Sequence, residues 1–429
     1  MERTSENIVE PNAVAVGRDE MLFLADSCQE ALVAVDWPSG ITHAADGNGW
    51  IAGQRSGAAF CFSSAGDLNA LDIAVLLHAK IVSALSSSCW AKRETMIERP
   101  EVGMWAGVSS LGAIADDGRY LDELGFRSIW TGEQQESMIA AGLLSAVVRR
   151  ADIGTAITQI TRPPALMALG ATTMQVLTDN RFRLGLGLGG VGVERWMGIP
   201  LARRSQRFVE YVRALRACLA ASRGAPVSFE GEFYQVRGYG AMVEHTAPPP
   251  PIWVAASGPM MLKAAGAVGD GVLLINLFPP SYFRDHARAL VERGAREAGR
   301  DPAEVKVGFT RYAAVDPDRS TARERMRATI ARSALSDYHQ RVLGLAGFGE
   351  EAAGIKAAAE RGDAAAGRAA VSDDLIDAVA IVGTSDDIRR QIAAYGDYGD
   401  MILLHTANAG LSPAEGDAHN RRLAEAVAG

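Results

Sequence analysis

Short apolar runs alternate with amphipathic or Ala-, Leu- and Arg-rich stretches from about residue 101 to the C-terminus. This alternation is the pattern of parallel βαβ units, in which a buried strand is followed by a helix. The predicted strands are 102–108, 128–131, 153–158, 183–188, 252–256, 271–275, 305–312 and 401–405. Eight such units predict an α/β fold of the (β/α)8 barrel type, also called a TIM barrel. The alternative is a doubly wound sheet, which needs fewer strands or an open edge.

The helices between these strands are predicted from periodicity and from their first residues. Pro163, Pro259 and Pro280 stand where a proline is tolerated in the first turn of a helix, and Ser385 with Asp386 offers an N-cap. The predicted helices lie near Leu121 and at 137–149, 163–177, 204–221, 259–268, 280–298, 319–360 and 385–395.

Three segments do not fit the repeat. The insertion 227–251 alternates polar and apolar residues and then runs through HTAPPPP, which predicts a hairpin with an extended return. The segment 354–371 is rich in Ala, Glu, Arg and Gly, and we expect a solvated helix and linker there. Residues 1–100 form an N-terminal extension of unassigned fold, with a hairpin turn expected at 46–49 and a helix at 71–85; the predicted barrel domain is 101–429.

Composition and charge narrow the functional classes. The 429-residue chain has a formal net charge of −8, which opposes general binding to nucleic acid or anionic membranes and favours small-molecule partners. The sequence starts without a secretory signal pattern and has no apolar run long enough to span a bilayer, so a cytoplasmic location is expected. The four cysteines have no zinc-type spacing, and no metal site is predicted.

Active sites of (β/α)8 barrels lie at the C-terminal ends of the strands, so the residues after each predicted strand are the candidates. The run RLGLGLGGVG places Gly187, Gly189 and Gly190 there, where a ring or phosphate can approach the backbone; a tight turn is the alternative. A nucleotide P-loop is excluded, because the spacing is wrong and no lysine follows. The run IWVAASGP continues into a helix, whose N-terminus is suited to an anion, although an ordinary βα turn is equally compatible. The residues concerned are Ala255, Ala256, Ser257, Gly258 and Pro259.

Four blocks of sequence carry a resemblance to a known family. They are ELGFRSIWTGEQ at 123–134, GTAITQITRPPALMALGATTMQVLTDNRFRLGLGLGG at 154–190, PIWVAASGPMMLKAAGAVGDGVLLIN at 251–276 and IVGTSDDIRRQIAAYGDYGDMILL at 381–404. Together they resemble the luciferase-like monooxygenase superfamily and, within it, the F420-dependent oxidoreductases similar to methylenetetrahydromethanopterin reductase. The resemblance covers the chain from about residue 101 to its end.

The resemblance implies a barrel, often a homodimer, with the ring of F420 or FMN in the barrel mouth. It implies a non-prolyl cis peptide between Ala156 and Ile157, at a position that backs the ring. Thr158 and Gln159 would then border the ring, and the segment 255–259 would hold the phosphate-bearing tail.

The sequence departs from the family pattern at two places. Several relatives carry an Asp-His pair after the second strand, whereas this chain has Glu133 and Gln134, and glutamine cannot act as a general acid or base. Gln134 is therefore expected to donate hydrogen bonds, while Glu133 is a candidate proton handler or cofactor contact, with a solvated loop carboxylate as the alternative. Relatives also have a basic residue where this chain has Met260, which leaves Lys263 as the nearest cation.

Other side chains are weaker candidates. His405 closes the last strand and is a candidate catalytic residue, although a lone histidine is more often structural. Trp130 and Trp253 are expected to pack inside the barrel. A group of arginines near the fourth predicted helix could bind the anionic tail of a cofactor, with solvated surface side chains as the alternative. The group consists of Arg195, Arg203, Arg204 and Arg207.

These features predict an F420-dependent oxidoreductase that transfers hydride between the deazaflavin and a small organic substrate. An alternative on the same fold is an FMN-dependent monooxygenase that receives reduced flavin from a separate reductase and uses oxygen. A third is a barrel that has lost catalysis and binds a ligand. A metal hydrolase is disfavoured, because no strand end carries paired His or Asp ligands.

Overall fold

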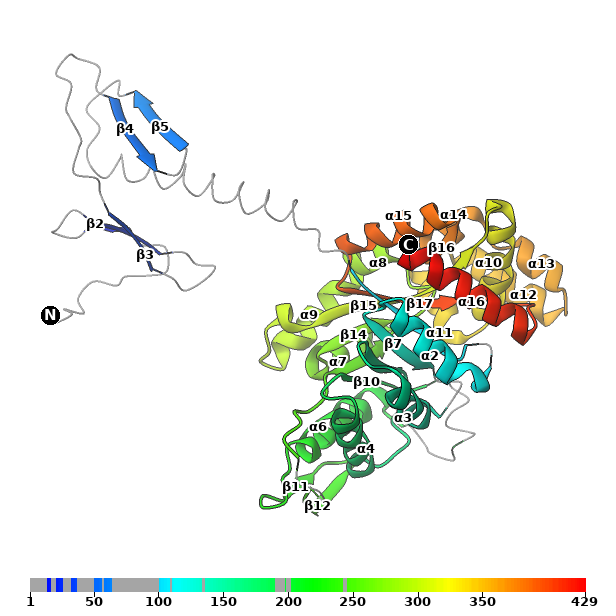
Figure 1. Cartoon of the computed structure of the whole chain (residues 1–429), viewed down its shortest axis with the longest axis horizontal. Helices are drawn as coiled ribbons and strands as arrows, with labels where there is room; N and C mark the ends of the chain where they lie inside the picture. The colour runs from blue at the N-terminus through cyan, green and yellow to red at the C-terminus, as the bar shows by residue number, and fades with distance from the viewer. Residues whose placement is uncertain are drawn as a thin grey trace. The chain divides into compact units, whose positions relative to one another are not determined.

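The computed structural model describes residues 100–108, 110–132, 136–189, 197, 202–241 and 245–429, together with five short strands before residue 100. The chain divides into two compact units, Met1–Ile97 and Glu98–Gly429 (Figure 1). In the first unit, β1 (Val14–Val16), β2 (Met21–Ala25) and β3 (Leu32–Asp36) form an antiparallel sheet, and β4 (Trp50–Arg55) pairs with β5 (Ala58–Ser63). The turn expected at 46–49 and the helix expected at 71–85 lie outside the described residues.

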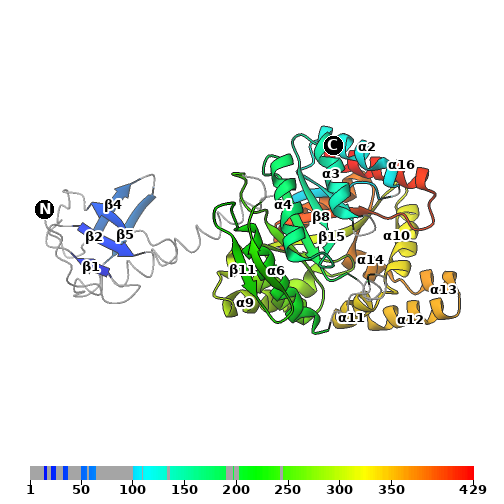
Figure 2. The same cartoon turned by 90° about the horizontal axis from the view of Figure 1, so that it is seen from below.

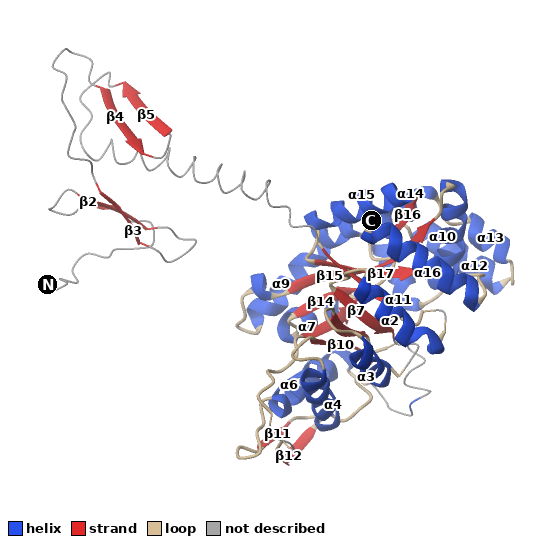
Figure 3. Cartoon of the chain, in the orientation of Figure 1, coloured by secondary structure: helices blue, strands red, loops and turns tan. Residues whose placement is uncertain are grey.

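The second unit contains a closed parallel barrel, with its strands at the centre and its helices outside (Figure 3). Each strand pairs in parallel with the next, β10 pairs with β13, and β17 pairs with β6. The (β/α)8 barrel prediction is therefore confirmed, and the open doubly wound sheet is excluded. The eight strands are β6 (Glu101–Trp105), β7 (Ser128–Gly132), β8 (Asp152–Ala156), β10 (Phe182–Gly187), β13 (Ile252–Ala256), β14 (Gly271–Leu274), β15 (Lys306–Val315) and β17 (Met401–Thr406).

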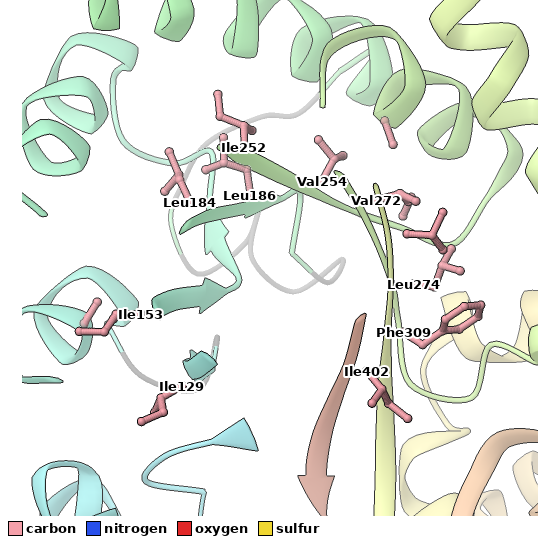
Figure 4. Packing of buried hydrophobic residues seen from close by; sticks show 14 of the residues in the cluster. Ile129, Ile153, Leu184, Leu186, Ile252, Val254, Val272, Leu274, Phe309 and Ile402 are labelled. Carbon is pink, nitrogen blue, oxygen red and sulfur yellow. The ribbon is translucent and has the colours of Figure 1, made fainter. Parts of the chain in front are cut away.

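Side chains alternate between the outer face of the barrel and its lumen, because neighbouring residues of a strand point to opposite faces. The outer side chains pack against the helices, and Figure 4 shows those of Ile129, Ile252 and Val254 among them. The neighbouring Trp130 and Trp253 lie in the lumen with Leu273, Met401 and Leu403. These apolar side chains form a floor below the C-terminal rim of the barrel.

The helices follow the strands as predicted. Helix α7 (Pro259–Val268) has the predicted bounds, and its first-turn proline is Pro259. The others are α2 (Ile114–Glu123) after the 3-10 turn η1 (Leu111–Ala113), α3 (Ser137–Val147), α4 (Pro164–Leu177), α6 (Arg204–Leu219), α8 (Pro280–Tyr282) with the π-helical turn η2 (Phe283–Ala287) and α9 (Arg288–Glu297), the 3-10 turn η3 (Pro302–Glu304), and α15 (Ser385–Ala394) with η4 (Tyr395–Asp397).

The last helix, α16 (Pro413–Ala428), was not predicted. Its start carries a capping box, in which the Ser412 hydroxyl accepts from the Glu415 amide and the Glu415 carboxylate accepts from the Ser412 amide. Pro413 occupies the first turn. Ser412, Pro413 and Glu415 are therefore a helix-start signal that can be seen in the sequence.

The segment between β15 and β17 forms a helical lobe, and here one prediction is wrong. The lobe consists of α10 (Arg319–Ser333), α11 (Asp337–Leu345), α12 (Gly349–Glu360), α13 (Ala364–Ala369), α14 (Asp373–Val379) and the short strand β16 (Ala380–Gly383), which extends the sheet beside β15. Instead of a solvated helix and linker, 354–371 contributes Ile355 and Val371 to a buried cluster with Met326 and Leu375. Small alanines allow these helices to pack closely, so an Ala-rich composition hid a buried face.

The predicted hairpin is confirmed as β11 (Val227–Glu230) and β12 (Gln235–Tyr239). The Glu210 carboxylate of α6 accepts hydrogen bonds from the backbone amides of Glu232, Phe233 and Tyr234 at 3.0, 2.6 and 2.7 Å, which fixes the hairpin turn on that helix. The hairpin and the lobe lie on opposite sides of the barrel (Figures 1 and 2).

Charged side chains lie at the N-terminal end of the barrel. The Arg183 guanidinium donates to Glu101 Oε1 at 2.8 Å and to Asp152 Oδ2 at 2.9 Å, and Ser128 Oγ donates to Glu101 at 2.7 Å. The pKa of Arg183 is raised, because its carboxylate neighbours outweigh the effect of burial. This network joins β6, β7, β8 and β10 at the end opposite the predicted site.

Candidate active site

One half of the barrel mouth is lined by small residues. The Ala156–Ile157 peptide bond at the end of β8 is cis, as the resemblance implied. Opposite the Ile157 side chain stands Gly187, where a Cβ would lie 2.1 Å from Ile157 Cδ1 and 3.3 Å from Ala255 Cβ. The structure therefore brings together three of the predicted site residues, from β10, β13 and the end of β8.

The residues after the cis bond are fixed by two sets of hydrogen bonds. Thr158 and Gln159 form the short strand β9 (Thr158–Gln159), which pairs with the end of β10. Thr158 Oγ1 lies 2.8 Å from Ser137 Oγ, and both side chains are buried. The start of α3 thereby holds Thr158 beside the small half of the mouth.

The N-terminus of α7 opens at the same rim. Its N-cap residue Gly258 has no side chain to cap the free amides, and Ser257 precedes it. The guanidinium of Arg341 lies beside this helix start, with Nη1 3.8 Å from the position of a Cβ on Gly258. Lys263, the cation expected from sequence, forms an ion pair with Glu297 at 2.5 Å instead. Arg341 is therefore the cation that the structure brings to the start of α7.

Three aromatic rings line the other half of the mouth. His405 of β17 lies between Trp105 of β6 and Tyr312 of β15, with ring centroids 4.1 and 4.9 Å away. Burial, together with the smaller effect of the positive charge of Arg332, lowers the pKa of His405 to about 3. The imidazole is therefore neutral at physiological pH, which removes a general-acid role that requires the imidazolium.

The remaining sequence candidates have different outcomes. Glu133, Gln134, Gly190 and Arg195 lie outside the described residues. Gly189 has a φ of 69°, a value that favours glycine and agrees with the tight-turn alternative. Ala256 is buried, and Pro259 is the first residue of α7.

None of the three described arginines near α6 is simply solvated. Arg203 pairs with Glu232, and Arg207 lies with Cζ 4.5 Å from the centroid of the Phe233 ring. Arg204 donates to the Gly189 carbonyl oxygen at 3.3 Å. These contacts stabilise the hairpin and the turn after β10.

The two lumenal tryptophans pack as predicted. Trp130 and Trp253 meet edge to face with centroids 6.3 Å apart. Glycines on adjacent strands leave room for them, since a Cβ on Gly154 would lie 2.2 Å from Trp130 and one on Gly271 would lie 2.4 Å from Trp253. Their role in the floor of the mouth is structural.

A buried acid fixes the loop after β6. The Gly107 amide donates to Asp117 Oδ2 at 2.9 Å, and Asn420 Nδ2 lies 3.4 Å from the same oxygen. Burial raises the pKa of Asp117 to about 6, with Asp417 adding to the effect. This network ties the loop that follows Trp105 to α2 and α16.

Sequence reasoning missed Arg341 and Trp105. Arg341 follows Gly258 by more than eighty residues, and spacing alone gives no signal that the two meet. Trp105 lies in the middle of the predicted strand 102–108, whereas β6 ends at Trp105, so the predicted strand end was placed three residues too late.

Three further observations concern cavities, metal ligands and membrane-spanning helices among the described residues. A cavity of about 520 Å³ lies between α4, α6 and the hairpin segment, and the residues that line it include none of the predicted site residues. No cluster of metal-ligating side chains occurs among the described residues. Within the same part of the chain, no helix combines the length and apolar character needed to cross a bilayer.

Comparison with known proteins agrees with this geometry. Residues 93–400 match the family model described as luciferase-like monooxygenase. The chain belongs to this family. The predicted resemblance is thereby confirmed, and with it the assignment to oxidoreductases that use a deazaflavin or a flavin.

One curated relative and two solved structures illustrate the similarity, and the structures show the shared fold. The 5,10-methylenetetrahydromethanopterin reductase of Methanolobus tindarius is 30% identical over 292 residues, which cover 67% of this chain and 87% of the relative. The structure of the coenzyme F420-dependent tetrahydromethanopterin reductase of Methanopyrus kandleri matches with a TM-score of 0.63 and 22% identity, over 76% of this chain and 98% of that chain. The monooxygenase RslO1 of Streptomyces bottropensis matches with a TM-score of 0.54 and 22% identity, over 76% and 98%.

Proposed function

We propose that this protein is an F420-dependent oxidoreductase that transfers hydride between the deazaflavin and a small organic substrate. Support comes from the 30% identity to a methylenetetrahydromethanopterin reductase over 87% of that relative. The catalytic unit in this proposal is the barrel from residue 101 onward. In this proposal the N-terminal extension 1–100 takes no part in the hydride transfer.

The small half of the mouth is the observation that carries the proposal. Ala156, Gly187 and Ala255 carry no side chain larger than a methyl group, and the Ile157 side chain packs against Gly187, where a Cβ would lie 2.1 Å from Ile157 Cδ1. Such a face fits a flat ring. We assign the ring of the cofactor to Ala156, Ile157, Thr158, Gly187 and Ala255.

The tail of the cofactor would be held nearby, at the start of α7. The free amides after Gly258 and the positive end of the helix dipole suit a phosphate. Arg341 adds a guanidinium on the same side, so the basic residue that relatives carry in place of Met260 is not required. Ala256, Ser257, Gly258 and Pro259 complete this part of the proposed site, and Gly189 and Gly190 stay predicted cofactor-binding residues.

The cofactor, when bound, supplies the hydride chemistry, while the protein orients the reactants and excludes water. Neutral His405 contributes hydrogen-bonding nitrogens and not a proton from an imidazolium. Glu133 is the proposed proton handler, and Gln134 a proposed hydrogen-bond donor to the substrate or the ring.

The FMN-dependent monooxygenase remains the second candidate, favoured by the fold match to RslO1. It requires reduced FMN from a separate reductase. Oxygen consumption separates the two candidates: protein loaded with reduced FMN consumes oxygen in a substrate-dependent manner only if the second candidate is right.

We also propose that the barrel pairs with a second copy through α3 and α4. Neither helix contains a charged residue, and exposed apolar side chains lie on both, with Ile139 72% exposed. The others are Leu143, Leu166, Val176 and Leu177. An uncharged apolar face of this kind suits the self-complementary interface of a homodimer.

The proposed function is tested by the cofactor that the protein retains. The full chain would be produced in a host that makes both F420 and FMN, and the cofactor released on denaturation would be identified by its absorbance. F420 is the expected cofactor. Recovery of FMN alone would favour the monooxygenase.

A further inference from the structure

The aromatic half of the mouth contains two polar atoms that the protein does not satisfy. Nε1 of Trp105 and Nδ1 of His405 are buried, and neither has a hydrogen-bond partner among the described residues. His405 as a whole is only 8% exposed. Most buried polar groups in folded proteins are hydrogen-bonded. Trp105 and His405 belong to a small set of described residues with an unsatisfied buried polar atom, and their rings lie side by side in the aromatic half of the mouth.

Neighbouring polar groups show the contrast. The Tyr312 hydroxyl accepts a hydrogen bond from Ser333 Oγ at 3.0 Å, and the indole N–H of Trp130 in the floor donates to Ser128 Oγ at 2.8 Å. The protein therefore provides partners for these two polar atoms. At Trp105 and His405 the partners are left to be supplied by a bound molecule.

We propose that Trp105 and His405 form the substrate-recognition pair of this enzyme, and that the substrate is an uncharged molecule carrying a hydrogen-bond acceptor, such as a carbonyl oxygen or an imine nitrogen, on a flat apolar framework. The inference rests on the proposed function, because it assigns the substrate to the half of the mouth opposite the proposed cofactor ring. The indole N–H donates to the acceptor atom of the substrate, and a neutral imidazole offers a second donor or acceptor.

The aromatic rings around His405 are the reason for proposing that the substrate has a flat apolar framework. Tyr312 and Trp105 flank His405 with ring centroids 4.9 and 4.1 Å from the imidazole, which leaves a surface of ring faces and edges. Below them lie the apolar floor residues Leu403 and Trp253. Rings stack on such a surface with favourable offset or edge-to-face geometry.

The lack of charged side chains among the described residues around this half of the mouth is the reason for proposing an uncharged substrate. The positive charge of Arg332 lowers the pKa of His405, but Arg332 itself is solvent-exposed on α10. Arg311 of β15 is buried on the outer side, where it donates to the Tyr395 hydroxyl at 2.7 Å and to the Thr310 carbonyl at 2.8 Å. No described side chain of the aromatic surface or the apolar floor carries a charge. An ionised substrate group would lose its hydration there without gaining a counterion.

The experiment compares probes of one size on the full chain loaded with its cofactor. Cyclohexanone carries the acceptor, methylenecyclohexane has the same shape without a comparable acceptor, and cyclohexanecarboxylate and cyclohexylammonium carry charges. Dissociation constants are measured by ligand-observed NMR titration. Cyclohexanone should bind about five- to tenfold more tightly than methylenecyclohexane, as one hydrogen bond of ordinary strength requires. Both charged probes should bind more weakly than cyclohexanone.

Trp105→Phe keeps an aromatic ring and removes the N–H. The ratio of the two dissociation constants, methylenecyclohexane over cyclohexanone, should therefore fall toward one, and any preference that remains would come from His405. Trp130→Phe is the matched control, because its N–H already has a protein partner; it should lower the melting temperature and leave the preference unchanged. Equal binding of the two neutral probes, tighter binding of a charged probe, or an unaltered preference in Trp105→Phe would overturn the inference.

The cofactor titration separates this inference from the proposed function. Protein that binds neither F420 nor FMN would refute the oxidoreductase proposal. In that case the same probe preference, measured without cofactor, would still decide whether Trp105 and His405 recognise a neutral acceptor.

Discussion

Gly187 lies directly against Ile157: a Cβ on Gly187 would lie 2.1 Å from Ile157 Cδ1. The glycine of β10 therefore determines where the side chain that follows the cis bond can lie. In our account the position of Ile157 defines the surface that receives the cofactor ring.

Replacement of Gly187 tests that relationship. Gly187→Ala should push Ile157 toward the mouth, lower cofactor affinity at least tenfold, and destabilise the fold by about 1 to 3 kcal/mol, as overpacked positions do. Gly142→Ala is the control, because nothing lies within 4 Å of a Cβ at this position of α3, and it should leave cofactor affinity unchanged. Affinity is measured by fluorescence titration. Unchanged cofactor affinity in Gly187→Ala would argue against the assigned ring site.

Arg341 is predicted to bind the phosphate of the cofactor. Arg341→Gln should weaken binding of F420 by about tenfold, which corresponds to the loss of one charge-assisted hydrogen bond, while affinity for a phosphate-free deazaflavin core stays the same. Lys263→Gln removes a cation from α7 that is already paired with Glu297, and should change neither affinity. If Lys263→Gln and not Arg341→Gln weakens F420 binding, the assignment is wrong.

The buried acid Asp117 predicts a dependence of stability on pH. Its pKa is raised from 3.8 to about 6 by burial and by Asp417 and Asp116, against the opposing effects of the Gly107 amide and Arg421. The folded state therefore holds this proton more tightly than the unfolded state. Stability from this group is present below pH 4 and is lost as pH rises through about 6, by up to about 3 kcal/mol.

Asp117→Asn keeps an acceptor for Gly107 and removes the titration. The difference in unfolding free energy between the variant and the wild type should grow in favour of the variant between pH 4 and pH 7. Urea denaturation of both proteins at several pH values measures it. A difference that does not vary with pH would contradict the burial argument.

The apolar face of α3 and α4 predicts the oligomeric state. Ile139→Lys combined with Leu143→Lys should convert a dimer into a monomer, because charged groups in an interface core lose their hydration. Leu345→Lys on α11 alters an apolar side chain that is also exposed, and should not change the mass. Sedimentation velocity reports the masses. A monomeric wild type, or a dimer that survives the double substitution, would be incompatible with this interface.

Local signals in the sequence predicted the barrel well. Strands and helices such as β13 and α7 were found because hydrophobic runs, proline positions and helix periodicity are properties of neighbouring residues. The same kind of signal at Ser412 and Glu415 would have found α16. The Ala-rich segment 354–371 was misinterpreted, because small residues give little contrast between a solvated face and a tightly packed one.

The site could be predicted only in part, because its two halves depend on contacts between distant strands. The family resemblance supplied the Ala156–Ile157 cis bond and the residues around it. It did not supply Arg341, which reaches Gly258 from a different helix, or the stacking of His405 on Trp105 across the closure of the barrel between β17 and β6. No local pattern encodes either contact.

Equilibrium binding of F420 and, in parallel, of FMN to the purified full-length protein tests the central claim most directly. Quenching of cofactor fluorescence gives the two dissociation constants. F420 should bind tightly and FMN more weakly, and Gly187→Ala should weaken the binding of both. Binding of neither cofactor would contradict the claim.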